Sequence, residues 1–380
     1  MLTDNMKHYA LASQPRLLSL IKALCKIPAP SHHEQKRAEF VCKWFQDQGF
    51  HAYIDDALNV ICPWGVTQDN DLVTVMAHTD TVFPDLKPLP FEETARYFRC
   101  PGVTDDTAHL AVMMICARYF MKNYPAPKTG ILFVANSCEE GLGNLKGSRK
   151  IVSDFGNRLQ ALITLDGGST LQRVVNEAVG SHRYRVTVRT EGGHSFNAFG
   201  NRNAIHVLAT MIDKLYGQQV PQMEGTKTTF NVGTIEGGTS VNTIAQEATM
   251  LYEYRSDNRQ CLLQMKQQFE AVIEQFLADG FDVDAQLIGD RPCTGDVDRE
   301  KQKALEELLS ASILRMTGEP ADFASGSTDC NAALAEGIPS VCVSACLGGN
   351  CHTREEYLEI ESLKAGTCLI MDFLSELIEK

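Results

Sequence analysis

Short apolar runs alternate with amphipathic stretches along the first half of the chain. Three runs rich in aliphatic and β-branched residues are typical of buried strands, and they occupy residues 72–77 (LVTVMA), 130–135 (GILFVA) and 161–165 (ALITL). Amphipathic helices are predicted at 17–25 and 34–48, and a helix that is apolar on nearly all sides at 106–121. Buried strands that alternate with helices predict an α/β domain with a mostly parallel sheet.

The pattern changes near Gly180, where polar and apolar residues begin to alternate. Half-exposed strands are predicted at 183–189, 228–235, 247–255 and 282–287, with helices at 202–216 and 258–277. This order predicts a small antiparallel sheet covered on one face by two helices. The buried pattern returns after Pro292, with a strand at 340–344 among predicted helices. We therefore predict one α/β domain, residues 1–180 and 291–380, interrupted by an inserted α+β domain, residues 181–290.

Side chains of the kinds that bind metals follow the predicted strands. They are His78 and Asp80 after the first, Glu139 and Glu140 after the second, Asp166 after the third and His352 after the fourth, while Asp105 and Asp106 begin the buried helix. Singly, such a histidine is more often structural and such an aspartate pair a helix cap. The carboxyl ends of parallel strands, however, share one edge of the sheet, where ligand sites form. Because all of these side chains are predicted at that one edge, a metal site is favoured. Zinc, manganese and cobalt accept imidazole and carboxylate ligands.

The adjacent glutamates suggest what such a site would do. Two metal ions ~3.5–4 Å apart share a bridging carboxylate and can lower the pKa of a common water. Hydrolysis also needs a base that lies close to the metals without binding them. Because adjacent side chains point in different directions, one of Glu139 and Glu140 can bind metal while the other handles the proton.

Several motifs together give the chain a family resemblance. They are HTDTV (78–82), which fits HxDxV; GVTDD (102–106), which fits G-x-x-D-[DM]; CEEG (138–141); DGG (166–168); and His352. GGHS (192–195) and GGTSVN (237–242) in the inserted domain fit recurrent lid motifs of the same family. The chain resembles the family of peptidase T, aminoacylase, carboxypeptidase G and succinyl-diaminopimelate desuccinylase over essentially its whole length, and peptidase T-like tripeptidases most.

The resemblance implies a zinc exopeptidase-like fold and two divalent metal ions per chain, zinc first, with cobalt or manganese as alternatives. It implies that His78 and Asp166 bind one ion, that Glu140 and His352 bind the other, and that Asp105 bridges them. Asp80 would orient His78, and Glu139 would be the general base and then the acid. The peptide bond after Asp105 is often cis in this family.

The resemblance also gives the inserted domain a role as a lid and dimerisation domain. His194 would reach the substrate in the partner subunit's site of a homodimer, although beside two glycines it could equally be a turn residue. Asn242 and Arg255 are candidates to hold the substrate carboxylate, Arg255 through a bidentate fork. Arg255 could instead be a surface residue at the end of an exposed strand.

Four positions depart from the family pattern or invite a second interpretation. Thr107 stands where the family commonly has lysine, which is not a metal ligand. Cys138 and Cys351 each precede a site residue, and we expect both to pack rather than react. Asp166 is aspartate rather than glutamate, which in this family is more typical of members that cleave peptides than of deacylases.

Composition narrows the range of partners and compartments. The net charge is -13, from 48 acidic and 35 basic residues, which argues against nucleic acid as a partner. No apolar run is long enough for a membrane span, and the first residues do not resemble a signal peptide. The 13 cysteines are scattered without a CxxC pair, which favours reduced thiols in the cytoplasm.

These observations predict a homodimeric metallo-exopeptidase that cleaves amide bonds of short peptides, as an aminopeptidase acting on di- or tripeptides. An N-acyl amino acid deacylase and a non-catalytic metal-binding scaffold are the alternatives, although a scaffold has no use for the spare base Glu139. A dinucleotide loop at Gly141 would set two glutamates against a pyrophosphate. A Cys351–His352 nucleophile pair is disfavoured because adjacent residues seldom face each other.

Overall fold

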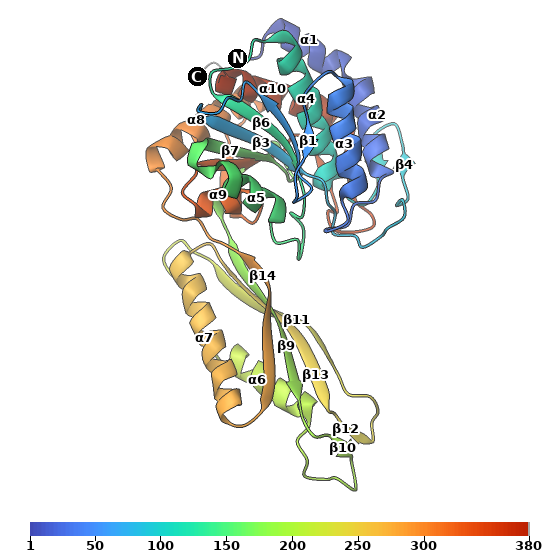
Figure 1. Ribbon diagram of the computed structural model, residues 1–380, viewed down its shortest axis with the longest axis vertical. Coiled ribbons are helices and arrows are strands. Elements are labelled where there is room, and N and C mark those ends of the chain that lie inside the picture. Colours follow the sequence, from blue (N-terminus) through green and yellow to red (C-terminus); the bar gives the residue numbers. More distant parts are fainter. Residues whose placement is uncertain (379–380) are drawn as a thin grey trace. The chain divides into compact units, whose positions relative to one another are not determined.

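The computed structural model describes residues 1–378 of the 380-residue chain. These residues form two compact units (Figure 1). Unit 1 comprises Met1–Ala178 and the chain from Gly295 onward, and unit 2 comprises Val179–Thr294. Within the described residues, no helix combines the length and apolar character that a membrane span needs.

Unit 1 is built on an eight-stranded sheet with the strand order β1-β2-β6-β3-β7-β16-β8-β15. The strands are β1 (Tyr53–Ile54), β2 (Val60–Trp64), β3 (Leu72–His78), β6 (Gly130–Asn136), β7 (Leu159–Leu165), β8 (Arg173–Ala178), β15 (Asp322–Gly326) and β16 (Ser340–Val343). β3 pairs in parallel with β6 and β7, and β7 pairs in parallel with β16. β2 runs antiparallel to β6, which makes the sheet mixed. The predicted α/β fold with a mostly parallel sheet is confirmed.

Helices cover both faces of this sheet. One face packs against α1 (Asp4–Ala12), α2 (Gln14–Cys25), α3 (Gln35–Asp47), α4 (His109–Asn123), α8 (Arg299–Thr317) and α10 (Ser362–Ile378). The other face packs against α5 (Lys146–Phe155) and α9 (Cys330–Ala335). Val73 and Val75 of β3 belong to the first core, whereas Leu72 and Met76 belong to the second, because successive strand residues point to opposite faces. Burial on both faces explains why the central strands are apolar throughout.

The buried helix begins later than its apolar pattern predicts. α4 starts at His109 rather than at 106, and a π-helical turn, η1 (Val103–Ala108), precedes it. Asp105 and Asp106 have non-helical backbone angles within that turn and are joined by a cis peptide bond. The two aspartates therefore leave the helix axis and face the end of β3 instead.

A second, smaller sheet in unit 1 joins segments that are far apart in the sequence. Its strand order is β17-β18-β5-β4, formed by β4 (Glu92–Glu93), β5 (Tyr97–Arg99), β17 (Gly348–Gly349) and β18 (Tyr357–Glu359). β18 runs antiparallel to β5, with Tyr357 opposite Arg99. This pairing brings the turn before α4 beside the segment that contains His352.

Unit 2 is an antiparallel sheet with the strand order β11-β13-β9-β14. Its strands are β9 (Gly180–Arg189), β11 (Thr228–Gly237), β13 (Glu247–Ser256) and β14 (Asp282–Arg291). α6 (Ala204–Tyr216) and α7 (Arg259–Ala278) pack on the apolar side chains of these strands, as the alternating pattern predicts. Asn203 and Asn258 cap the two helices by accepting backbone N–H bonds.

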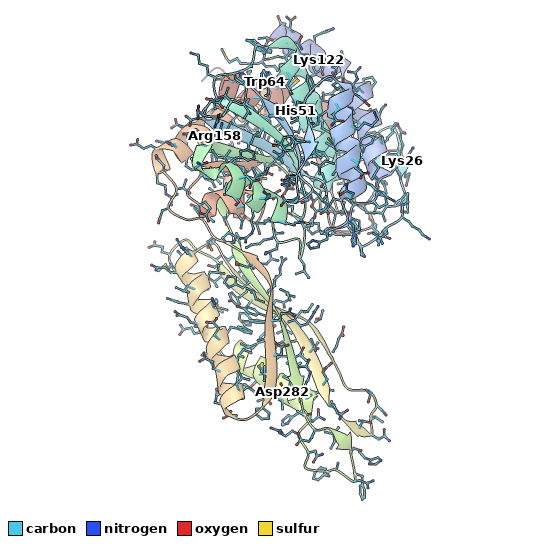
Figure 2. The ribbon with its side chains drawn as sticks, viewed as in Figure 1. Lys26, His51, Trp64, Lys122, Arg158 and Asp282 are labelled. Carbon is cyan, nitrogen blue, oxygen red and sulfur yellow. The ribbon has the colours of Figure 1, made fainter. Side chains whose placement is uncertain are left out.

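The two edges of this sheet differ in charge. The edge strand β14 carries three aspartates, the first of which, Asp282, is labelled in Figure 2. The opposite edge strand β11 has Glu236 as its one charged residue. Charge on an edge strand discourages pairing with another chain. The β11 edge is therefore the more open to strand addition.

Candidate metal centre

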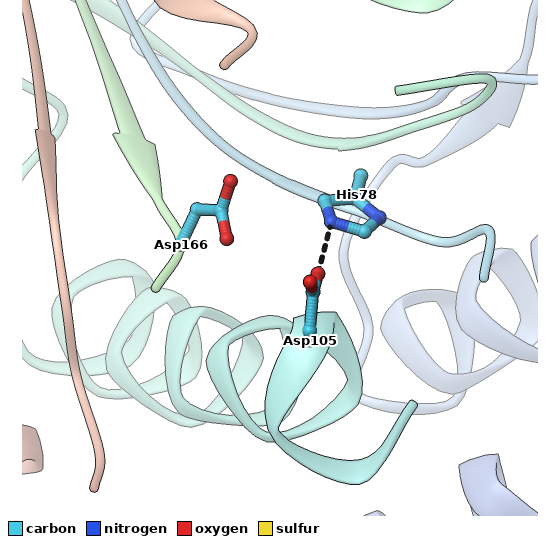
Figure 3. A group of neighbouring side chains, drawn as sticks. All are labelled: His78, Asp105 and Asp166. Carbon is cyan, nitrogen blue, oxygen red and sulfur yellow. Dashed lines mark hydrogen bonds and ion pairs between the residues drawn. The ribbon is translucent and has the colours of Figure 1, made fainter. Parts of the chain in front are cut away.

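Three predicted ligands from different parts of unit 1 meet at the end of the parallel strands (Figure 3). His78 is the last residue of β3, Asp166 directly follows β7, and Asp105 lies in η1. His78 Nε2 lies 3.0 Å from Asp105 Oδ1. One nitrogen or oxygen atom from each residue falls within 4.8 Å of the others, which is the spacing of donors that can share a metal ion.

A second group of three shares Asp105 with the first. His352 Nε2 lies 3.0 Å from Asp105 Oδ2 and 3.2 Å from Glu140 Oε1. The two carboxylate oxygens of Asp105 thus face two different imidazoles, one in each group. This is the arrangement that a carboxylate bridging two ions requires. The structure brings all five predicted ligands together.

Burial and mutual repulsion act on the carboxylates of this centre. Burial, followed by the nearby charge of Asp105, raises the pKa of Glu140 to about 8 and that of Asp166 to about 6. Burial alone would raise the pKa of Asp105, but hydrogen bonds to His352 and His78 hold it well below its usual range. Hydrogen bonds to Asp105 and Glu140 raise the pKa of His352 to about 11. Buried carboxylates are stable when cations neutralise them, so this set of donors fits two divalent ions.

Comparison with known protein families gives a match over most of the chain. The model of "Peptidase family M20/M25/M40" matches residues 74–376.

The chain belongs to this family.

As a member of the M20 family, the chain is a metallohydrolase, and its curated relatives include both named and uncharacterised proteins. It is 24% identical over 387 residues to the uncharacterised protein YqjE of Bacillus subtilis (strain 168), covering 96% of this chain and 99% of that protein. It is 33% identical over 75 residues to the cytosol non-specific dipeptidase of Escherichia coli (strain K12), which is 19% of this chain and 15% of that protein.

Solved structures share the M20 fold of this chain. A tripeptidase from Staphylococcus aureus superposes with a TM-score of 0.79 at 21% identity, covering 97% of this chain and 99% of that one. The aminopeptidase PepT from Bacillus cereus superposes with a TM-score of 0.70 at 22% identity, with the same coverage of both chains.

Asp80 contacts the centre in two ways, through His78 and through the two glutamates. His78 Nδ1 lies 3.1 Å from the backbone carbonyl of Asp80 and 3.5 Å from its carboxylate. The same carboxylate accepts the backbone N–H groups of Glu139 and Glu140, each at 3.0 Å, and the Ser31 hydroxyl at 2.6 Å. Asp80 therefore fixes the backbone of both glutamates, a contact that the sequence motif does not reveal.

The two glutamates occupy different places at the centre. Glu140 belongs to the group that contains Asp105 and His352. Glu139, whose side chain is also buried, belongs to a third group with His78 and Glu140, again with donor atoms within 4.8 Å. Glu139 thus lies beside the shared ligands without belonging to either group that contains Asp105.

Asp106 and His109 form a layer behind the ligands. Asp106 Oδ2 accepts the backbone N–H of His78 at 2.8 Å, and its Oδ1 lies 2.9 Å from His109 Nδ1. His109 Nε2 lies 3.2 Å from the hydroxyl of Ser344. This role of His109 could not be predicted from the sequence, because a single histidine in an apolar helix has no distinctive pattern.

Two of the positions singled out by comparison with the family, Thr107 and Cys138, are packed within unit 1. Arg37 has a buried guanidinium whose Nη1 lies 3.5 Å from the Thr107 hydroxyl. Cys138 is buried, and its thiol donates to Glu34 at 3.1 Å, while burial raises the pKa of that thiol to about 12. Cys351 is exposed.

The residues predicted to contact substrate from the inserted domain all lie in unit 2. His194 is exposed in β10 (Gly193–His194), which pairs with β12 (Thr243–Ile244). The carbonyl of Asn242 accepts the Ser195 N–H at 2.9 Å, so Asn242 and His194 lie in adjacent loops. Arg255 lies near the opposite end of β13 from these loops and pairs with Glu253 at 3.0 Å. Unit 2 by itself does not bring Arg255 together with Asn242.

Proposed function

We propose that the protein is a two-metal exopeptidase that cleaves short peptides, acting as an aminopeptidase on di- and tripeptides. The observation that carries this proposal is the position of Asp105, whose two oxygens each lie 3.0 Å from a different imidazole. Membership of the M20 family supports hydrolysis, and the peptidases that share the fold support a peptide substrate.

His78 and Asp166 would hold one ion and Glu140 and His352 the other, with Asp105 shared between them. When bound, two such ions, zinc by our proposal, supply Lewis-acid catalysis and lower the pKa of a shared water. The nitrogen and oxygen donors also accept cobalt and manganese.

Glu139 would move the proton in this reaction. Its carboxylate would take a proton from the attacking water and then deliver it to the amide nitrogen that leaves. The backbone N–H bonds from Glu139 and Glu140 to Asp80 support these separate roles, because they hold the backbone from which the two adjacent side chains extend.

Unit 2 would act as a lid and as the dimerisation surface of a homodimer. The sparsely charged β11 edge supports pairing with a second copy. His194 would contact substrate in the partner's site, and Asn242 and Arg255 would bind its carboxylate. All thirteen cysteines are free thiols, which supports a reducing cytoplasmic location.

The test is amino acid release from free-amine di- and tripeptides and from their N-acetylated counterparts, with zinc, cobalt or manganese supplied. We expect cleavage of the free-amine set alone. Release from N-acyl amino acids alone would contradict the proposal and make the protein a deacylase, while inactivity on both sets would favour a scaffold. Glu139→Gln should abolish turnover and retain metal, whereas Glu140→Gln, which makes the same change one residue on, should lose metal.

A further inference from the structure

Glu356 is a buried carboxylate that has no part in the chemistry above. It follows His352 by four residues and directly precedes β18, and its side chain is 1% exposed. Its Oε2 accepts the N–H of Gly102 at 2.7 Å, and its Oε1 accepts those of Thr104 and Asp105 at 2.8 and 3.0 Å. All three N–H groups lie in the turn that carries the shared ligand Asp105.

This turn needs an acceptor from outside itself. The first N–H groups of a helical turn have no carbonyl partner within it, and Gly102 enters η1 with a left-handed φ of 76°. Buried backbone N–H groups are almost always paired. The two oxygens of a glutamate carboxylate can accept all three hydrogen bonds. A glutamine side chain has the same shape, but an NH₂ donor replaces one of the two acceptor oxygens.

The segment that contains Glu356 is attached to the same turn at further points. Thr104 Oγ1 donates to the carbonyl of Tyr357 at 2.8 Å, and the Cys100 N–H donates to the carbonyl of Glu356 at 3.2 Å. His352 Nε2 lies 3.0 Å from Asp105 Oδ2. One short segment therefore supplies the predicted ligand His352 and also holds the backbone of a second predicted ligand, Asp105, which lies 251 residues from Glu356 in the sequence.

We infer that Glu356 is a positioning residue for the metal centre: by holding the backbone of residues 102–105, it sets the place of Asp105 relative to His352. This inference rests on the proposed function, because it takes Asp105 and His352 as metal ligands. Residues that orient metal ligands typically change metal affinity or activity by about 10–100-fold when they are replaced.

The test compares Glu356→Gln with Glu355→Gln, which makes the same change at the exposed neighbouring position. Zinc affinity is measured by competition with a chromophoric chelator, and folding by circular dichroism. We expect Glu356→Gln to bind zinc about 10–100-fold more weakly, with unchanged secondary structure and Glu355→Gln like wild type. Excess zinc should restore kcat without changing KM. Zinc affinity within twofold of wild type in Glu356→Gln would overturn the inference.

If Glu356→Gln does not fold, amide hydrogen exchange of the metal-free wild type tests the positioning role of Glu356 instead. Slow exchange at Gly102, Thr104 and Asp105 supports the inference, and fast exchange at all three overturns it. A wild type that binds zinc but cleaves no peptide would refute the proposed substrate alone, since zinc affinity still reports on Glu356. A wild type that binds no divalent metal would refute both the function and the inference.

Discussion

Replacing Asp80 with asparagine should impair turnover through the backbone of the two glutamates. The Asp80 carboxylate accepts the N–H of Glu139 on Oδ1 and that of Glu140 on Oδ2. Asparagine has one acceptor oxygen, so whichever way its amide is turned, one of these buried N–H groups faces another donor. The contact from His78 Nδ1 to the backbone carbonyl of residue 80 remains available.

The size of the effect follows from the cost of that unpaired group. Leaving one buried polar group unsatisfied costs about 1–3 kcal/mol. If the backbone relieves the clash by moving Glu139 out of position, the cost appears in the barrier, where about 1.4 kcal/mol is tenfold in rate. We therefore expect kcat to fall by roughly 5- to 150-fold.

The assay is the steady-state kinetics of tripeptide cleavage at saturating zinc, with zinc affinity measured on the same preparations. Asp56→Asn is the matched control, because it makes the same change at an exposed position of unit 1. A kcat for Asp80→Asn within twofold of wild type would show that turnover does not depend on these two bonds. A loss of zinc affinity that accounts for the whole effect would show that Asp80 acts through His78 instead.

Three further predictions concern stability and metal content. Arg37→Met should lower the free energy of unfolding by about 3 kcal/mol or more, because the guanidinium donates to the carbonyls of Leu24, Ile27 and Thr79. Urea unfolding measures this free energy. A loss no larger than that of the exposed control Lys36→Met would contradict the prediction. Gly366→Ala should lower the free energy of unfolding by about 1–3 kcal/mol or more, because a Cβ there would overlap the carbonyl oxygen of Ala345. The control is Ala365→Ser, at the exposed neighbouring position. A Gly366→Ala variant as stable as this control would contradict the prediction. Removing divalent ions with a chelator should lower Tm, and added zinc should restore it, because ions that bind the folded state stabilise it. An unchanged Tm would argue against ions bound within the folded unit.

The sequence predicts the part of the site that depends on local pattern. His78, Glu139 and Asp166 could be placed because each lies at the end of an apolar strand or shortly after it, and parallel strands end at a common edge. The predicted start of α4 is three residues too early, because an apolar helix pattern does not show where η1 departs from helical angles. β8 and β15 were not predicted, since their burial is partial and irregular.

The residues that hold the ligands in place could not be predicted. Glu356 acts on Asp105 across 251 residues of sequence, and Asp80 acts on Glu139 across 59. Such contacts arise between loops, which have no hydrophobic period to indicate which segments meet. Glu34, Arg37 and His109 are likewise single polar residues whose partners become evident once the fold is known.

In the mechanism we propose, Asp105 bridges two metal ions in unit 1. A crystal structure of the zinc-loaded protein, with anomalous diffraction recorded on both sides of the zinc absorption edge, tests it most directly. We predict two zinc peaks about 3.5–4 Å apart, with one Asp105 oxygen on each ion, His78 and Asp166 on the first, and Glu140 and His352 on the second. A single peak, or two peaks with Asp105 bound to neither, would contradict the account.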